Sequence, residues 1–460
     1  MKTFQTFFIK SHTWNPETLQ ASFLFSFDNE VEFTETINFT CEEFTPIQNA
    51  DPAIISNLLF HLSLAIGISY YKLCPTKEII VENGYLNDEQ KKFRNQFYIN
   101  GLGEYFFKNE ISPKGLCQFV NSKEAADFSF LGKQFTPTRQ QIMVAIGGGK
   151  DSLVSVELVK KLGLPFYTST FGKDYALHQM VSKKIDAARL VMQRTMDEKL
   201  FEMNEAGYYN GHVPISGIIA FVLVTAAYLY DYNFIVMSNE KSASEGNTIM
   251  DGIEINHQRS KSLDFELAFA EYLQHAITND VTYFSLLRGM YEIKIAELFA
   301  QYPQYFDVFS SCNTNFKILE ESLTKIGLKA KNNFRRCNSC PKCAFVYAIL
   351  RPFVTADQAK TIWGEELYEK ESLLTTFRAL LGIEGIKPFE CVGTNEEVVL
   401  GMKKSLDMWK GDLPVILEMF AREIGAQMKH EDWVALEEKL FTISDEGNIP
   451  GLFHPLLSSL

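Results

Sequence analysis

Apolar residues follow two different periods along the middle of the chain, and the changes of period predict where strands and helices lie. Short apolar runs rich in branched side chains predict buried strands at 142–146, 165–170, 188–194 and 234–237. Helical spacing between these runs predicts helices at 151–161, 175–184 and 218–230. Residues 213–216, just before the third helix, are predicted to be the end of a further strand. Strands that alternate with helices are typical of an α/β protein with a parallel sheet covered on both faces.

The two ends of the chain follow other patterns. Residues 22–27 and 31–37 nearly alternate between apolar and polar, which predicts a β-hairpin with one face in solvent. Two helices are expected to follow it, at 54–71 and 88–107. Beyond Pro352 the pattern is mainly helical, at 356–369, 373–381, 396–410, 413–424 and 430–440. We therefore expect three parts: an N-terminal α+β module (1–135), a parallel-sheet domain (136–352) and a C-terminal helical module (353–460).

A glycine-rich loop opens the central part and carries its most specific motif. Gly147-Gly148-Gly149-Lys150-Asp151-Ser152 lies between a predicted strand and a predicted helix. Glycines let the backbone approach a ligand closely, and a helix N-terminus offers free N–H groups to an anion. The loop is not a Walker A motif, because Asp151 follows the lysine where that motif has Ser or Thr. The alternative interpretation is an ordinary turn without a ligand.

The loop resembles the SGGxDS motif of the ATP pyrophosphatase (PP-loop) superfamily, with Gly147 where that family usually has serine. The resemblance implies a sheet of PP-loop type and cleavage of ATP between its α- and β-phosphates. It also implies that the amides of Gly147, Gly148 and Gly149 hold phosphates. Lys150 and Ser152 would offset charge on the departing pyrophosphate, and Asp151 would bind Mg²⁺ directly or through water.

Polar residues gather after the predicted strand at 234–237. The segments 238–247 and 256–261 are rich in amides, hydroxyls and cations, and they include His257 and Lys261. In a parallel sheet, ligands bind at the carboxyl ends of the strands, so these segments are candidates for a charged, hydrogen-bonding substrate. The candidate substrate ligands are Asn239, Glu240, Ser242, Asn256 and Arg259. A solvated loop is the alternative.

Four cysteines have the spacing of a metal site. Cys337, Cys340 and Cys343 form two interlocked CxxC steps, and Cys312 lies 25 positions upstream of the first. Four thiolates in tetrahedral geometry suit a structural Zn²⁺ best. An iron–sulfur cluster and buried free thiols are the alternatives. Three cations beside the cluster would offset thiolate charge or reach a phosphate or carboxylate: Arg335, Arg336 and Lys342.

The composition and charge of the chain limit the kinds of partner that we expect it to bind. The chain has 460 residues, of which 46% are hydrophobic, enough to fill the cores of two or three domains. Its net charge of −13 argues against a nucleic acid as the main partner. The N-terminus has no signal-like apolar region, and the apolar run 217–230 is too short to span a bilayer. With eight cysteines, these features predict a cytoplasmic protein without a membrane partner, and no obligatory protein partner is evident.

Taken together, the motifs resemble the MurL family of UDP-N-acetylmuramoyl-L-alanyl-L-glutamate epimerases, which act in bacterial peptidoglycan synthesis. The similar stretches are spread through most of the first 350 residues: 70–72, 100–104, 147–152, 210–214, 238–243, 256–261 and 337–343. The cysteine set alone is also similar to the zinc site of the deazaguanine synthases of queuosine biosynthesis, which share the glycine loop.

The resemblance implies an ATP-dependent epimerase that inverts the terminal L-Glu of UDP-MurNAc-L-Ala-L-Glu through an acyl-adenylate, releasing AMP and pyrophosphate. Such an enzyme needs a base with a pKa near neutrality. An unperturbed His257 meets this condition, whereas Lys261 would need desolvation or a nearby cation. His212 is a further candidate.

Two other functions stay open. A PP-loop ligase or nucleobase-modifying enzyme would adenylate its substrate and pass it to an amine or a sulfur nucleophile. A non-catalytic, zinc-stabilised nucleotide binder would release no pyrophosphate. The N-terminal module has no catalytic spacing and is expected to shape the substrate site or the fold, while the chemistry of the C-terminal helices is not readable.

Overall fold

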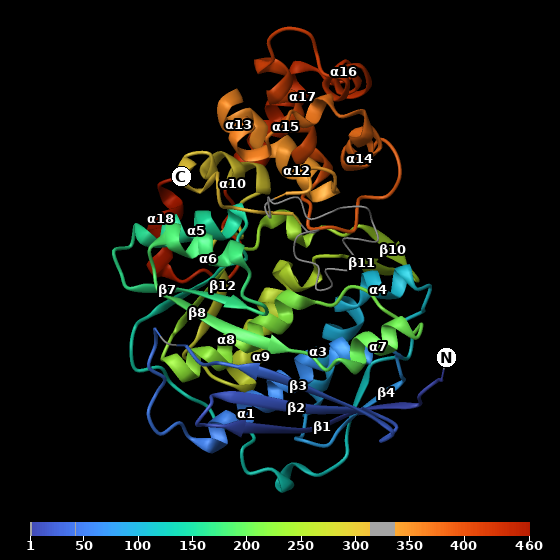
Figure 1. Ribbon diagram of the computed structural model, residues 1–460, viewed down its shortest axis with the longest axis vertical. Helices are drawn as coiled ribbons and strands as arrows, with labels where there is room; N and C mark the ends of the chain where they lie inside the picture. The colour runs from blue at the N-terminus through green and yellow to red at the C-terminus, as the bar shows by residue number, and fades with distance from the viewer. Residues whose placement is uncertain (1, 42, 313–335) are drawn as a thin grey trace.

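The computed structural model describes residues 2–41, 43–312 and 336–460, and its main feature is a ten-stranded sheet (Figure 1). Five strands come from the central part of the chain: β6 (Ile142–Ala145), β7 (Phe166–Phe171), β8 (Arg189–Thr195), β9 (Phe234–Met237) and β12 (Thr282–Ser285). Five come from the N-terminal part: β1 (Thr6–Asn15), β2 (Gln20–Phe27), β3 (Val31–Asn38), β4 (Glu78–Val81) and β5 (Gln118–Asn121). Their order is β12-β9-β6-β7-β8-β3-β2-β1-β4-β5.

The sheet is mostly parallel, as expected for an α/β protein. All pairings among the five central strands are parallel, and so are β1–β4 and β4–β5. The antiparallel pairings are those of the predicted hairpin β2–β3 and its neighbours, β1–β2 and β3–β8. A single sheet therefore runs from the N-terminal part into the central part, and the division of the chain into three modules stays a prediction.

Most predicted central elements are present, but one prediction is wrong. The predicted helices correspond to α5 (Lys150–Lys160), α6 (Ala176–Ile185) and α8 (Ile215–Tyr230). Residues 213–216 form no strand, because Pro214 ends the loop and α8 begins directly after it. Proline has no N–H for a strand ladder, yet it is tolerated where a helix begins. The sequence patterns did not identify α7 (Lys199–Glu205), α9 (Leu263–Ala276), α10 (Glu292–Phe299) or the hairpin β10–β11 (Thr248–Met250 and Ile253–Ile255).

Both N-terminal helices are present, each divided in two. They form α1 (Pro52–Ile66) with α2 (Ile68–Tyr71), and α3 (Asp88–Gly101) with α4 (Gly103–Lys108). Of the described residues, one helical stretch, Pro52–Tyr71, is long and apolar enough to cross a membrane by length and composition. Of its most apolar window, 83% is buried inside the protein, which is also what a core helix shows.

The C-terminal helices stand above the sheet in Figure 1. They are α12 (Pro341–Leu350), α13 (Ala356–Trp363), α14 (Leu374–Leu380), α15 (Asn395–Met408), α16 (Val415–Phe420) and α17 (His430–Phe441). Their buried side chains share one hydrophobic core with those of β6, α5 and α10. The chain then returns to the sheet before α18 (His454–Ser458), where the Phe453 ring packs on Phe234 and Phe284. The C-terminal helices and the glycine-loop helix are therefore packed as one body.

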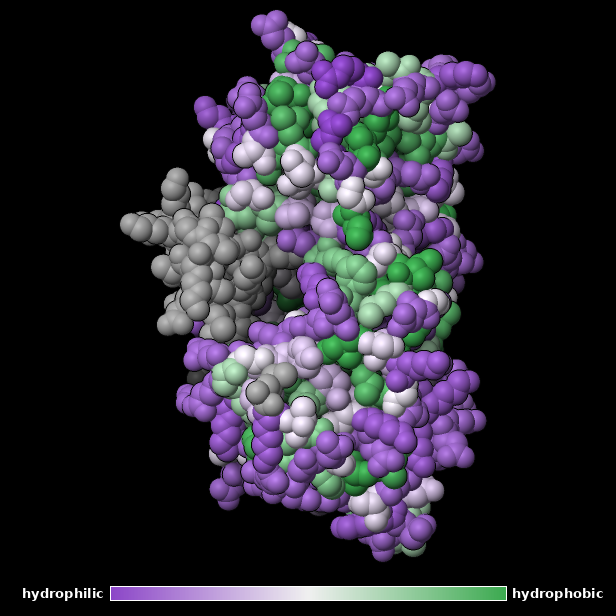
Figure 2. All heavy atoms as spheres, turned by 90° about the vertical axis from the view of Figure 1, so that its right-hand side faces the viewer, coloured by the Kyte–Doolittle hydropathy of each residue, from purple (hydrophilic) through white to green (hydrophobic). Residues whose placement is uncertain are grey.

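One face of the molecule is largely hydrophilic. Figure 2 shows this face with charged and polar residues over most of its surface and hydrophobic residues in smaller patches between them. Among the large hydrophobic side chains that are exposed, Ile249 and Ile386 have exposed fractions of 71% and 51%.

The two halves of the sheet meet at β3 and β8, where a buried ion pair supports the joint. The guanidinium of Arg194 binds both carboxylate oxygens of Glu35, with Nε–Oε1 and Nη2–Oε2 distances of 2.7 and 3.0 Å. Arg194 Nη2 also donates to Ser69 Oγ at 2.9 Å. The Glu35 side chain is fully buried and that of Arg194 is 7% exposed.

We expect Glu35→Ala to destabilise the protein by about 3–5 kcal/mol, because removing one partner leaves a buried charge without compensation. Thermal and urea unfolding would measure the loss. Glu30→Ala, which removes the exposed pair with Lys2, is the matched control and should change stability by less than about 1 kcal/mol. Equal effects of the two variants would contradict a supporting role for the buried pair.

Candidate active site

The glycine loop leaves the N-terminus of α5 open. Gly149 is the N-cap of α5 and makes no side-chain capping hydrogen bond. Gly148 has a φ of +79°, a conformation that favours glycine. A Cβ added to Gly147 would meet no heavy atom within 4 Å. An uncapped helix start with open space beside it fits a phosphate group.

A cavity of about 920 Å³ lies beside this loop. It is bordered by the carboxyl ends of β6, β7 and β9 and by the side chains of Asp151 and Ser152. From β6, the chain adds strands first on one side, as β7 and β8, and then on the other, as β9 and β12. Open α/β sheets bind ligands at such a change of direction, so the cavity lies where the fold predicts a site.

About half of the sequence-predicted site residues line this cavity. They are Gly147, Gly149, Asp151, Ser152, Asn239, Glu240 and Lys261. Glu240 is buried, and this burial together with the nearby Glu292 charge raises the pKa of its carboxyl to about 7. The fully buried Arg288 donates to the backbone carbonyls of Glu240 and Lys261, at 2.9 and 2.8 Å, and so holds the two residues in place.

Lys150 lies beneath the loop instead of in the cavity. It is fully buried and forms ion pairs with Asp151 and with Glu292, the latter at 2.5 Å. Burial opposes its charge, but the two carboxylates outweigh this effect and raise the pKa of Lys150. Lys342 binds the same Glu292 carboxylate at 3.2 Å. Burial likewise opposes the charge of Glu292, but the two lysines lower its pKa to about 2. Contact of Lys150 with a phosphate stays a prediction.

Three predicted substrate ligands point elsewhere. Asn256 donates to the Ala243 carbonyl and accepts from the Gln258 amide, which fixes the local turn. Arg259 pairs with Asp264 at 3.1 Å and borders a separate small cavity. Ser242 is fully buried and does not line the main cavity. Contact of these three side chains with a substrate therefore stays a prediction that this arrangement does not favour.

His257 is held by a residue that the sequence patterns did not single out. Its Nδ1 hydrogen-bonds the buried carboxylate of Glu104, on α4, which also pairs with Lys108. Burial opposes the His257 charge, but hydrogen bonds to Cys391 and Glu104 raise its pKa to about 9. His257 therefore holds a proton at neutral pH, unlike the unperturbed histidine that the sequence predicted. His212 also faces Glu104, and burial and the His257 charge lower its pKa to about 3.

Cys391 is the second site residue that sequence reasoning missed. It lines the cavity from the C-terminal part of the chain, and Lys261 Nζ lies 3.5 Å from its Sγ. Nothing in the spacing of this single cysteine distinguishes it. The family-like stretch at 100–104 was a signal for Glu104, but its position within that stretch gave no role.

Comparison with known proteins identifies the family. The family model of the MurL N-terminal domain matches residues 1–286, and that of the MurL C-terminal domain matches residues 308–434. The chain belongs to the MurL family. Both domain models fall on the site, since the first contains Glu104, the glycine loop and Lys261, and the second contains the four cysteines and Cys391.

Three MurL relatives are named UDP-N-acetyl-alpha-D-muramoyl-L-alanyl-L-glutamate epimerase. The protein of Xanthomonas oryzae pv. oryzae is 33% identical over 94% of this chain and 92% of its own length. The Micromonospora sp. protein is 35% identical over 85% of this chain and 83% of its own length. The Salinispora tropica protein is 32% identical over 90% of this chain and 88% of its own length.

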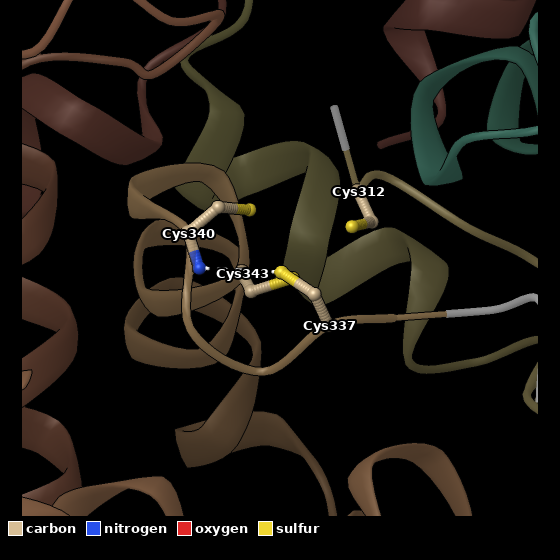
Figure 3. A group of neighbouring side chains, drawn as sticks. All are labelled: Cys312, Cys337, Cys340 and Cys343. Carbon is tan, nitrogen blue, oxygen red and sulfur yellow. Dashed lines mark hydrogen bonds between the residues drawn. The ribbon is translucent and has the colours of Figure 1, made fainter. Parts of the chain in front are cut away.

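The four predicted metal ligands of this MurL protein come together. Figure 3 shows Cys312, Cys337, Cys340 and Cys343 with their sulfurs facing one another, and the four Sγ atoms lie within 4.8 Å of one another. The Sγ atoms of Cys337 and Cys343 are 3.9 Å apart, close to the ~3.8 Å edge of a tetrahedron with ~2.3 Å zinc–sulfur bonds. The donor set therefore fits Zn²⁺. Of the three cations expected beside it, Arg335 lies outside the described residues.

The cysteine cluster borders the glycine loop. Ser310 donates its backbone N–H to the Gly148 carbonyl at 2.9 Å, two residues before Cys312. Lys342, between Cys340 and Cys343, reaches Glu292 beneath the loop. A metal bound here would fix both contacts.

We expect about one zinc per chain in protein purified without a chelator, measured by elemental analysis. Cys340→Ser should reduce this content to less than half and lower the melting temperature strongly, because structural zinc sites in peptides contribute about 10–16 kcal/mol. Cys41→Ser, which changes a half-buried cysteine outside the cluster, should keep the zinc. Iron with a visible absorbance would indicate a cluster, and no metal would indicate free thiols.

We expect Glu104→Gln to lower the pKa of His257 from about 9, because the variant removes the carboxylate that stabilises the imidazolium. NMR titration of the His257 ring would measure the change, with the exposed Glu89→Gln as control. Because the pKa of His257 is higher in the folded state, protonation of this ring stabilises the fold. The contribution is full at pH values below 6.5, the pKa in the unfolded chain, and it disappears as the pH rises through 9. The stability gap between wild type and variant should therefore close above pH 9. A gap that widens there would contradict the assignment.

Proposed function

We propose that this protein inverts the terminal L-glutamate of UDP-MurNAc-L-Ala-L-Glu to D-glutamate for peptidoglycan precursors, in an ATP-dependent reaction. The observation that carries the proposal is the match to the Xanthomonas oryzae pv. oryzae epimerase over 94% of the chain. The cavity supports it, because an anion-binding helix start and a cluster of ionisable side chains border the same space.

The chemistry explains why an epimerase would need ATP. A free carboxylate opposes removal of the neighbouring α-proton, since the product would place two negative charges side by side. Adenylation turns the carboxylate into a mixed anhydride, whose carbonyl accepts the electron pair. AMP and pyrophosphate are the products once water has released the inverted glutamate.

We assign ATP to the loop side of the cavity. The open N-terminus of α5 and the glycine backbone would hold the phosphates, and Asp151 would hold Mg²⁺, which prefers carboxylate oxygens. Ser152 Oγ donates to the Gly149 carbonyl, 3.0 Å away, and so stabilises the loop itself. Lys150 acts from beneath, where its ion pair orients the Asp151 carboxylate.

The glutamate end of the substrate belongs beside Lys261 and His257. Both side chains are cationic at neutral pH, because nearby anions raise their pKa values against the effect of burial. Fixed cations beside a developing enolate lower the barrier to its formation, since they need no reorganisation during the reaction. Asn239 and Glu240 also line the cavity, and the Glu240 carboxylate acts on Lys261, so both are candidates to contact the same part of the substrate.

We expect turnover in D₂O to place deuterium at Cα of the terminal glutamate only when ATP is present, with AMP and pyrophosphate as products. Mass spectrometry of the recovered glutamate, with chiral separation, would measure both inversion and exchange. A ligase would make AMP and leave the α-hydrogen untouched, and a nucleotide binder would make neither product. ADP as the nucleotide product would contradict the assignment of the loop.

The same assay tests the role that we assign to the glycine loop in binding ATP and Mg²⁺. Asp151→Asn should lower AMP formation by a factor of at least 100, because the variant removes the carboxylate assigned to Mg²⁺. Asp186→Asn is the matched control, since this exposed residue ends α6 in a left-handed conformation that asparagine also adopts. Near-normal activity of Asp151→Asn with an unchanged melting curve would remove Asp151 from the site.

A further inference from the structure

Cys391 occupies a fixed position in the wall of the cavity. The residues on either side of it are held by hydrogen bonds from two other segments. Gln258 donates its side-chain amide to the Val392 carbonyl at 3.1 Å, and the Lys342 backbone N–H donates to the Glu390 carboxylate at 3.0 Å. The thiol is therefore placed by the fold and does not sit on a free loop.

Three cations face this thiol, two from the 257–261 segment and one from α12. Lys261 Nζ lies 3.5 Å from Sγ, His257 hydrogen-bonds the sulfur, and Lys342 acts from the start of α12. Burial opposes ionisation of Cys391, but these charges outweigh it and lower the pKa of the thiol to about 6. The acidic groups nearby are Glu390, next in the chain, and Glu240, which faces Lys261.

Most other ionisable groups near Lys261 are less suited to accept a proton, and the exception is Glu240, whose pKa is raised to about 7 by burial. His257 already carries one at neutral pH, with its Nδ1 engaged by Glu104. Lys261 is itself a cation. Asp151 is paired with Lys150, and Asp174, farther along the cavity, is paired with Arg189. A thiolate is soft, weakly hydrated and beside two cations that would stabilise the enolate it helps to form.

We propose that Cys391 is the residue that removes the α-proton from the activated glutamate. The inference rests on the proposed function and adds its proton acceptor. The Cα–H bond breaks as the S–H bond forms, and the electron pair moves onto the anhydride oxygen, beside Lys261. Water then gives a proton to the opposite face of Cα. The hydroxide that remains takes the proton from the thiol, which restores the thiolate.

This assignment gives each part of the cluster a separate task. Glu104 keeps His257 protonated and correctly turned, and His257 with Lys261 keeps Cys391 ionised. Glu104 and His257 are thus positioning residues for the thiol, and Cys391 is the catalytic residue. Because Glu104, the pair His257 and Lys261, and Cys391 come from three different parts of the chain, the arrangement exists only in the folded protein.

The test compares Cys391→Ala and Cys391→Ser with wild type in the full-length, zinc-containing protein. The probes are UDP-MurNAc-L-Ala-L-Glu, ATP and Mg²⁺ in D₂O, with deuterium at Cα as one readout. The second readout is trapping of the activated carboxyl by hydroxylamine, which needs adenylation but no proton transfer. We expect both variants to lose deuterium uptake by about 10²–10⁴-fold, the usual contribution of a general base, and to keep hydroxamate formation within about threefold.

Two results would overturn the inference while leaving the epimerase intact. One is deuterium uptake at the wild-type rate in both variants. The other is equal loss of deuterium uptake and hydroxamate formation, which would give Cys391 a role in activation or folding. Wild-type protein that forms neither hydroxamate nor deuterated glutamate would instead contradict the proposed function. Cys41→Ala is the control for loss of a half-buried thiol away from the cavity.

Discussion

The buried carboxylate of Glu292 holds the site together. It lies at the start of α10 and forms ion pairs with Lys150, beneath the glycine loop, and with Lys342, which lies between two of the clustered cysteines. A buried charge is tolerated only when it is paired and hydrogen-bonded, so these three residues depend on one another. Through them the loop, the sheet domain and the first C-terminal helix take up fixed positions.

The candidate site draws on the whole chain because its interacting ionisable groups come from distant segments. Glu104 belongs to the N-terminal part, His257 and Lys261 to the loop after β9, and Cys391 to the segment before α15. Each changes the ionisation of its neighbour, and burial makes these charge interactions stronger than they would be in water. The two MurL domains are thus two contributors to one cavity, which neither would enclose alone.

Several residues of the candidate site could be predicted from the sequence because their signals are local. The glycine loop lies between a strand and a helix, and the cysteines repeat at CxxC spacing, so short-range geometry brings three of the four thiols together. Asn256 and Arg259 show the limit of this approach. They stand in the right segment, but hydrogen bonds to their own neighbours turn their side chains away from the cavity.

By itself, the sequence determined the central alternation of strands and helices, the loop, the cysteine set and the resemblance to MurL, since these depend on residue type and spacing. Only the tertiary structure decided that Lys150 is buried, that His257 is protonated and that Cys391 faces the cavity. The physical reason is that ionisation depends on which charges lie within a few ångströms and on how much water is excluded. Segments more than a hundred residues apart in the sequence supply those charges, and no local pattern records their meeting.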